Sequence, residues 1–157
     1  MTVRVAINGF GRIGRLVLRA AYEHELTEIE VVGINDLGPV ETNAHLLRYD
    51  SVHGRFLGEV TSGDNWIDIG RGKIRVTAER DPARLPWREL GVDVALECTG
   101  IFTRREAAVQ FGWERWLGHS GAFIGMTGFG ASAPGEALYP HFGITPEKVA
   151  EAARSLL

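Results

Sequence analysis

Three glycines near the start of the chain have the spacing that a dinucleotide-binding turn requires. The apolar run at residues 3–8 leads into Gly9, Gly11 and Gly14, which form the pattern G-x-G-x-x-G, and a helical pattern follows. In such a turn the first glycine permits the tight bend, the second leaves room for the phosphates, and the third lets the helix pack closely on its strand. Amide groups at the start of the helix would then face the anion, assisted by the helix dipole.

A carboxylate stands where such a turn needs an acid to bind the ribose. The second apolar run, residues 29–34, ends at Asn35 and Asp36, about twenty residues beyond the glycines. Asp36 can accept hydrogen bonds from both hydroxyls of an adenosine ribose, and it would repel a 2′-phosphate, to which the apolar Leu37 offers no donor. NAD is therefore the expected cofactor rather than NADP. The alternative role for Asp36 is to cap the helical segment that follows it.

Length and composition favour one globular domain. The 157 residues are 45% hydrophobic and 24% charged, with a formal net charge of −3. A chain of this length can bury a core but is short for an enzyme with separate cofactor and substrate domains. The charge gives no reason to expect nucleic acid as a partner. Because the sequence has neither a long apolar run nor a signal-peptide pattern, we expect no membrane association and a cytoplasmic location.

Cys98 is the only cysteine in the sequence, so neither an internal disulfide nor a cysteine-based metal site is expected. It follows the apolar run at residues 92–97. A thiol at the end of such a strand is expected to be buried and unreactive. We expect no metal site.

Hydrophobic periodicity predicts the elements that must hold the turn and the acid in place. Parallel strands are expected at 3–8, 29–34, 92–97 and 122–127, with a helix at 12–25 between the first two. A short helix is expected at 43–49 behind Thr42, followed by an antiparallel insertion of segments 57–61, 65–69 and 73–79 with a turn at 70–72. Helical spacing at 104–117 and a last helix capped by Thr145 complete the pattern. The expected fold class is α/β, a Rossmann-like, doubly wound and mostly parallel sheet of about five parallel strands with a small antiparallel insertion.

Four segments carry a specific family resemblance: AINGFGRIGR at 6–15, INDL at 34–37, HLLRYDSVHGRF at 45–56 and ECTGIFT at 97–103. Through them residues 2–108 closely resemble the NAD-binding domain of the glyceraldehyde-3-phosphate dehydrogenase family. The resemblance implies that the amides of Arg12 and Ile13 hold the pyrophosphate and that Asp36 holds the ribose. It places Arg80 and Thr99 around the adenine and its ribose. The candidate cofactor-binding residues are Gly9, Phe10, Gly11, Arg12, Ile13, Gly14, Asn35, Asp36, Arg80, Thr99 and Gly100.

This resemblance is expected to end near Val109. The nucleophile-bearing Ser-Cys-Thr-Thr-Asn segment of the family has no counterpart in the sequence, and Cys98 does not match that nucleophile. The chemistry of the family needs a thiolate to attack the aldehyde and a histidine base beside the nicotinamide. We therefore expect no catalytic residue and no complete hydride-transfer reaction by this chain alone.

The last part of the sequence resembles a second family. The segments FGW at 111–113, GFGASAP at 128–134 and FGITP at 142–146 are similar to the C-terminal end of transketolases. In that family the thiamine diphosphate and sugar-phosphate sites lie in other domains, so the resemblance implies no transketolase activity. The two resemblances predict a chimera joined near residues 108–110. In it, residues 1–108 and 109–157 form a single dinucleotide-binding domain, 1–157, whose sheet the tail completes.

Three functional hypotheses follow. The leading one is an NAD-binding domain derived from a glyceraldehyde-3-phosphate dehydrogenase, with NAD or another adenine nucleotide as its ligand. The second is a chimeric folding or assembly protein without ligand function, because a compatible fold does not guarantee an intact site. The third is an active NAD-dependent dehydrogenase. Surfaces that a parent enzyme would bury also suggest a homo-oligomer.

Overall fold

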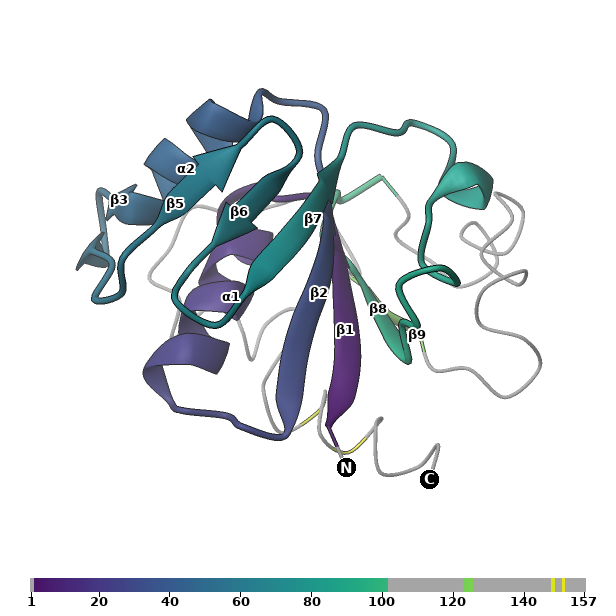
Figure 1. The fold of residues 1–157 in the computed structure, drawn as a ribbon, viewed down its shortest axis with the longest axis horizontal. Helices are drawn as coiled ribbons and strands as arrows, with labels where there is room; N and C mark the ends of the chain where they lie inside the picture. Colours follow the sequence, from purple (N-terminus) through teal and green to yellow (C-terminus); the bar gives the residue numbers. More distant parts are fainter. Residues whose placement is uncertain (1, 102–122, 126–147, 149–150, 152–157) are drawn as a thin grey trace.

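The structure of the chain, a computed structural model, describes residues 2–101, 123–125, 148 and 151 (Figure 1). Its elements are β1 (Val3–Asn8), α1 (Arg12–Glu23), β2 (Ile29–Asn35), α2 (Val40–Arg48), β3 (Tyr49–Asp50), β4 (Gly54–Arg55), β5 (Thr61–Gly63), β6 (Trp66–Asp68), β7 (Lys73–Thr77), the 3-10 turn η1 (Pro82–Arg84), β8 (Val94–Glu97) and β9 (Phe123–Gly125). The helices expected at 104–117 and after Thr145 lie outside the described residues, except that Lys148 and Glu151 are helical.

One sheet organises the described part of the chain. Its strands follow the order β5-β6-β7-β2-β1-β8-β9. The strands β7, β2, β1, β8 and β9 run parallel, and β6 and β5 add an antiparallel extension beyond β7. The expected α/β class, a mostly parallel sheet with a small antiparallel insertion, is confirmed. The segment expected at 73–79 as part of the insertion is β7, which pairs antiparallel with β6 but in parallel with β2, and it is therefore the fifth parallel strand. Counted along the chain, the parallel strands have the order 3-2-1-4-5, which is that of a doubly wound dinucleotide-binding sheet.

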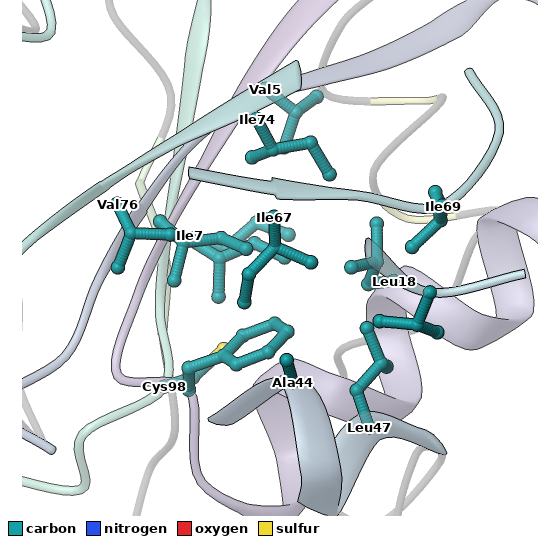
Figure 2. Packing of buried hydrophobic residues seen from close by; sticks show 14 of the residues in the cluster. Val5, Ile7, Leu18, Ala44, Leu47, Ile67, Ile69, Ile74, Val76 and Cys98 are labelled. Carbon is teal, nitrogen blue, oxygen red and sulfur yellow. The ribbon is translucent and has the colours of Figure 1, made fainter. Parts of the chain in front are cut away.

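The main core lies between the sheet and its two helices. Val5 and Ile7 of β1 point to this side, where they belong to one buried cluster with Leu18 of α1 and Leu47 of α2 (Figure 2). Burying a side chain of this size stabilises the fold by about 1.5–3 kcal/mol relative to leaving it exposed. The apolar periodicity of the first strand and helix is thus used for packing, which fixes where the intervening glycine turn must lie.

The opposite face of the sheet carries small residues beneath an indole ring. Trp87 is buried there with Ala6 and Ala95, and a Cβ at Gly33 would lie 2.7 Å from the Cζ3 atom of its ring. Because interiors are close-packed, a side chain as large as Trp87 requires small partners at these positions. The segment before β8 is thereby held against the sheet.

Two element boundaries differ from the sequence-based expectation by more than two residues. Helix α2 begins at Val40 rather than behind Thr42, because Pro39 takes the N-cap position and its carbonyl accepts the first helical bond from Asn43 at 3.0 Å. The insertion begins as a strand at Thr61 rather than at residue 57. Leu57 is 83% exposed, so the alternating pattern around it does not line a sheet.

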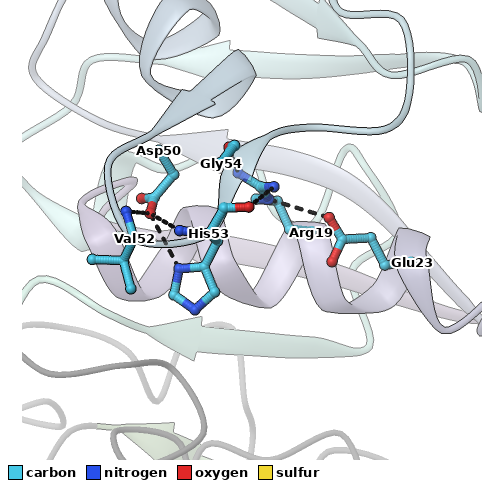
Figure 3. A network of polar contacts seen from close by, with 6 residues as sticks. All are labelled: Arg19, Glu23, Asp50, Val52, His53 and Gly54. Atoms are coloured by element: carbon cyan, nitrogen blue, oxygen red, sulfur yellow. Dashed lines mark hydrogen bonds and ion pairs between the residues drawn. The ribbon is translucent and has the colours of Figure 1, made fainter.

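A short antiparallel pair, β3 and β4, follows α2 and has its own polar support (Figure 3). The Asp50 Oδ1 atom accepts hydrogen bonds from the amides of Val52 and His53 at 2.9 and 2.8 Å, and it lies 3.1 Å from His53 Nδ1. Burial of the Asp50 carboxylate favours its neutral form, but these hydrogen bonds outweigh burial and lower its pKa to about 2. Arg19 of α1 donates to the carbonyls of His53 and Gly54, which joins the pair to the helix.

Candidate functional site

The candidate site lies at the carboxyl ends of β1, β2 and β8. β1 has β2 on one side and β8 on the other, so the order of connections reverses beside it. Ligands of open α/β sheets bind at such a reversal. The Gly9 amide donates to the Asn35 carbonyl at 2.8 Å and the Cys98 amide donates to the Asn8 carbonyl at 2.7 Å. These bonds bring the loops that follow the three strands together.

The three glycines of the turn meet different surroundings. Gly9 has a φ of +91°, and a Cβ there would lie 2.6 Å from the Thr99 nitrogen, so both backbone conformation and space demand glycine. A Cβ at Gly14 would overlap the Gly9 carbonyl oxygen and lie 2.9 Å from the Ile7 side chain. Gly11 is exposed, and a Cβ there would meet no atom within 4 Å. Open space at the second glycine is what close approach of a phosphate requires.

The N-terminus of α1 presents amides without a side-chain cap. Gly11 is the N-cap residue, no side chain bonds to the first turn, and no acidic residue lies in that turn. The first amides of a helix lack intrahelical partners, and together with the helix dipole they favour an anion. The Ile13 side chain is buried, so this residue can offer a ligand only its backbone. The amides of Gly11, Arg12 and Ile13 are therefore the candidate anion donors.

Asp36 reaches the glycine turn across the strand ends. Its Oδ2 atom accepts from the Phe10 amide at 2.8 Å, and its Oδ1 atom accepts from the Gly38 amide at 2.9 Å and the Asn43 side chain at 3.3 Å. Pro39, and not Asp36, is the N-cap of α2, so the capping alternative for Asp36 is not what the structure contains. A carboxylate oxygen has two acceptor sites. The half-buried Asp36 thus retains acceptor capacity on Oδ2 beside the turn.

The backbone amide and the backbone carbonyl of Phe10 are both bonded to side chains. Its ring is fully buried in the main core, its amide donates to Asp36, and its carbonyl accepts from the Arg15 Nη1 atom at 2.8 Å. Burial lowers the pKa of Arg15, although the nearby Asp50 and Asp36 oppose this effect. Arginine remains charged over the physiological range. The sequence analysis did not include Arg15 among the residues that support the turn. Its position one turn into α1, directly behind the glycines, was the available signal.

A chain of buried polar side chains runs beneath the site. Asn35 of β2 donates to Asn8 of β1 at 2.7 Å, and Asn8 donates to the Glu97 Oε2 atom of β8 at 2.6 Å. The Glu97 Oε1 atom accepts from the Thr99 amide at 2.8 Å and from the Thr99 hydroxyl. At the other end, Asn35 Oδ1 accepts from the Thr77 hydroxyl. Burial raises the pKa of Glu97, while its hydrogen bonds to Thr99 and Asn8 oppose that rise.

The remaining sequence-predicted residues are distributed along the flanks of the site. Thr99 lies against Gly9, and Gly100 follows it. Asn35 is 5% exposed and bonds to both the amide and the carbonyl of Glu79, which places Arg80 just beyond that contact. Arg80 itself is exposed. The structure therefore brings the turn, Asp36, Asn35 and Thr99 into one connected set, whereas Arg80 is joined to it only through its neighbour.

Cys98 takes no part in this polar set. The thiol is 7% exposed, and burial together with the neighbouring Glu97 raises its pKa. A thiol with a raised pKa carries little of the reactive thiolate form. The expectation of a buried thiol is confirmed. Within the residues that the structure describes, no group of His, Cys, Asp and Glu side chains could hold a metal ion.

None of the helices in the described part of the chain is long and apolar enough to cross a membrane.

Two family models match the sequence. The model for the glyceraldehyde 3-phosphate dehydrogenase NAD-binding domain matches residues 3–105. The model for the transketolase-like C-terminal domain matches residues 96–145. The two matches overlap at residues 96–105, and both resemblances read from the sequence are thereby confirmed.

Curated relatives carry the name glyceraldehyde-3-phosphate dehydrogenase. The protein of Cereibacter sphaeroides is 73% identical over 108 residues, which are 69% of this chain and 32% of that protein. The protein of Xanthobacter flavus is 58% identical over 149 residues, 95% of this chain and 42% of that protein. The protein of Thermotoga maritima is 56% identical over 105 residues, 67% of this chain and 32% of that protein. The chain thus spans about a third to two fifths of the length of these relatives. The Xanthobacter flavus alignment is too long to end at residue 108, where the resemblance was expected to stop.

Proposed function

The chain belongs to the family of the glyceraldehyde 3-phosphate dehydrogenase NAD-binding domain, and we propose that it binds NAD at the carboxyl ends of β1, β2 and β8. NAD is the cofactor of this family. The observation that carries the proposed site is the hydrogen bond of 2.8 Å from the Phe10 amide to the Asp36 carboxylate, next to the open space at Gly11. In this proposal the anion-binding turn and the ribose-binding acid are adjacent.

Each candidate residue has a distinct part in the proposed complex. The amides of Gly11, Arg12 and Ile13 bind the pyrophosphate at the start of α1. Asp36 accepts from one hydroxyl of the adenosine ribose with its remaining lone pair on Oδ2. Gly9, Phe10 and Gly14 shape the turn, and Asn35, Arg80, Thr99 and Gly100 lie along the two flanks. Bound NAD would supply a nicotinamide ring able to accept a hydride.

We propose weak binding without turnover. The chain spans less than half the length of its relatives, so the described residues offer contacts mainly to the adenosine diphosphate half of NAD. An affinity between tens of micromolar and millimolar corresponds to about 4–6 kcal/mol. The only cysteine of the sequence is buried with a raised pKa, which makes Cys98 unsuited to attack an aldehyde.

Isothermal titration with NAD and with ADP-ribose tests the proposal. ADP-ribose should bind nearly as tightly as NAD, because both carry the adenosine diphosphate contacts. Gly11→Val fills the open space at the turn and should weaken binding by at least tenfold, and Asp36→Ala should do the same through loss of the ribose contact. Gly11→Ala supplies a graded intermediate between glycine and valine. Unchanged affinity in both Gly11→Val and Asp36→Ala would mean that the assigned site is wrong.

A thermal melt distinguishes this function from a protein without ligand. A ligand that binds only the folded state raises the melting temperature by mass action. We expect millimolar NAD to raise it for the native sequence and to raise it by much less for Gly11→Val. If millimolar NAD left the melting temperature of the native sequence unchanged, a folding or assembly role without ligand would be favoured.

Self-association of the chain is proposed from an exposed apolar surface. Leu46, Tyr49, Val52 and Leu57 are between 38% and 83% exposed around the end of α2 and the β3–β4 pair. Contiguous apolar surface on a protein commonly marks a contact with another molecule. Sedimentation at increasing concentration should show a growing dimer or larger fraction, and a single monomeric species throughout would contradict this.

A further inference from the structure

The buried chain of side chains beneath the site has one direction of hydrogen bonding. Asn35 Nδ2 donates to Asn8 Oδ1, and Asn8 Nδ2 donates to Glu97 Oε2. Asn8 and Asn35 are 3% and 5% exposed, and Glu97 is 1% exposed. Buried polar groups of this kind must find their partners within the protein, because water cannot replace them.

We call the side chains of Asn35, Asn8 and Glu97 the relay. At each of its two ends, Asn35 and Glu97, the hydrogen-bond partners fix which atoms donate and which accept. Asn35 Oδ1 accepts from the Glu79 amide at 2.9 Å while Asn35 Nδ2 donates to the Glu79 carbonyl at 2.8 Å, so turning the Asn35 amide over would oppose like groups. Glu97 has acceptor oxygens toward both Asn8 and Thr99. The orientation of the Asn8 amide is therefore determined from two sides.

The relay touches the two flanks of the proposed nucleotide site. At one end Glu97 holds the amide and hydroxyl of Thr99, whose backbone lies against Gly9 of the turn. At the other end Asn35 holds the Glu79 backbone immediately before Arg80. Thr99 and Glu79 lie on segments that follow β8 and β7, on opposite sides of β1 and β2.

We infer that Glu97, acting through Asn8 and Asn35, is a positioning residue that sets the affinity for the nucleotide by holding Thr99 and Glu79 in register across four strand ends. This inference rests on the proposed NAD binding. The required property of Glu97 is that both of its oxygens accept hydrogen bonds. A glutamine of the same shape lacks this property, because its NH2 group must face either the Asn8 donor or the Thr99 amide donor.

An exchange of acid and amide tests the relay. Glu97→Gln leaves one buried donor unpaired and should weaken NAD binding by about tenfold. Asn8→Asp alone places two carboxylates within hydrogen-bond distance and should also weaken binding at neutral pH. The double variant Asn8→Asp with Glu97→Gln restores an acceptor to every donor, since the new amide donates to the new carboxylate, which still accepts from Asn35. Its affinity should return to within about threefold of the native value.

Titrations are made at a temperature where circular dichroism shows all four proteins folded. Glu59→Gln and Asn65→Asp are matched controls, because both residues are exposed and the same charges and amides are exchanged there. They should leave the affinity unchanged. An unaltered affinity in Glu97→Gln, or a double variant that binds no better than the weaker single variant, would overturn the inference.

A second measurement on the native chain covers the case in which Glu97→Gln does not fold. The side-chain NH2 protons of Asn8 and Asn35 should exchange with water at least about tenfold more slowly than those of the exposed Asn65. The amide resonances of Thr99 and Glu79 should also shift together on titration with NAD. Exchange as fast as that of Asn65 would overturn the relay. Absence of NAD binding by the native chain, with slow exchange retained, would instead overturn the proposed function and the effect on affinity, but not the hydrogen-bond arrangement.

Discussion

Single residues of the glycine turn differ in what a side chain would cost. A Cβ at Gly14 would overlap the Gly9 carbonyl oxygen, whereas a Cβ at Gly11 would meet nothing within 4 Å. Close packing of helix on strand therefore depends on Gly14 and ligand access on Gly11.

We predict that Gly14→Ala lowers the free energy of unfolding by about 2–3 kcal/mol through the forced shift of α1 against β1. Gly11→Ala should lower it by about 1 kcal/mol or less, since only the preference of the N-cap position changes. Urea denaturation of both variants measures the difference. Equal losses of stability in the two variants would contradict the assignment of helix packing to Gly14 and of ligand access to Gly11.

Asp50 makes the stability of the β3–β4 pair dependent on pH (Figure 3). Its pKa is lowered from 3.8 to about 2 in the folded protein. A lowered carboxyl pKa stabilises the folded state above the unfolded pKa, and the effect is lost as the pH falls through the folded value. We predict that Asp50→Asn lowers the unfolding free energy by about 1 kcal/mol at pH 6, a modest value because the pair is near solvent.

Denaturation at several pH values checks this sign. The difference between the native chain and Asp50→Asn should begin to shrink below pH 3.8 and be small near pH 2. Asp64→Asn is a suitable control, because Asp64 is an exposed carboxyl in another loop. A difference that persists at pH 2 would show that the carboxylate charge is not what stabilises the pair.

At the scale of elements, continuous apolar runs were the most informative part of the sequence. They predicted β1 at its observed bounds and β2 to within one residue, because burial on both faces leaves little freedom for such strands. The start of the short α2 was predicted less well: with Pro39 at the N-cap position, the helix begins at Val40, three residues before the expected start. The expected start of the insertion at Leu57 was wrong, because Leu57 is 83% exposed although Phe56 and Val60 near it are buried. Local pattern does not report which side of a short segment meets the core.

The candidate site could be predicted only in part for a similar reason. The spacing of the glycines and of Asp36 is a local property of one β-α-β unit, so it can be read along the chain. The relay of Asn35, Asn8 and Glu97 depends on strand register, in which Asn8 lies opposite Asn35 on one side and opposite Glu97 on the other. A polar residue at the end of each apolar strand was the available signal, but the pairing that joins them is formed only in the folded sheet.

At the scale of the whole molecule, β9 joins the late part of the sequence to the early part. Residues 123–125 pair in parallel with β8, opposite Ala95, Leu96 and Glu97. These residues lie within the stretch matched by the transketolase-like model, while β8 up to Glu97 lies within the dehydrogenase match. We propose on this basis that the chain folds as one domain and that its tail completes the sheet.

Deletion of residues 109–157 tests that proposal. Removal of β9 would leave the backbone groups of β8 without a partner at a new sheet edge, and exposed edges promote association with other chains. We predict loss of a single cooperative thermal transition together with aggregation. A shortened chain with the melting curve of the intact one would show that residues 1–108 fold independently.

The anchoring of Phe10 has a consequence for how fast a ligand can bind. Its ring is fully buried, and both polar groups of its peptide are bonded to side chains. A nucleotide therefore encounters a turn that already has a definite shape, and little ordering entropy opposes the complex. The association rate constant should accordingly be governed by diffusion and orientation, and differences in affinity among nucleotides should appear as differences in residence time.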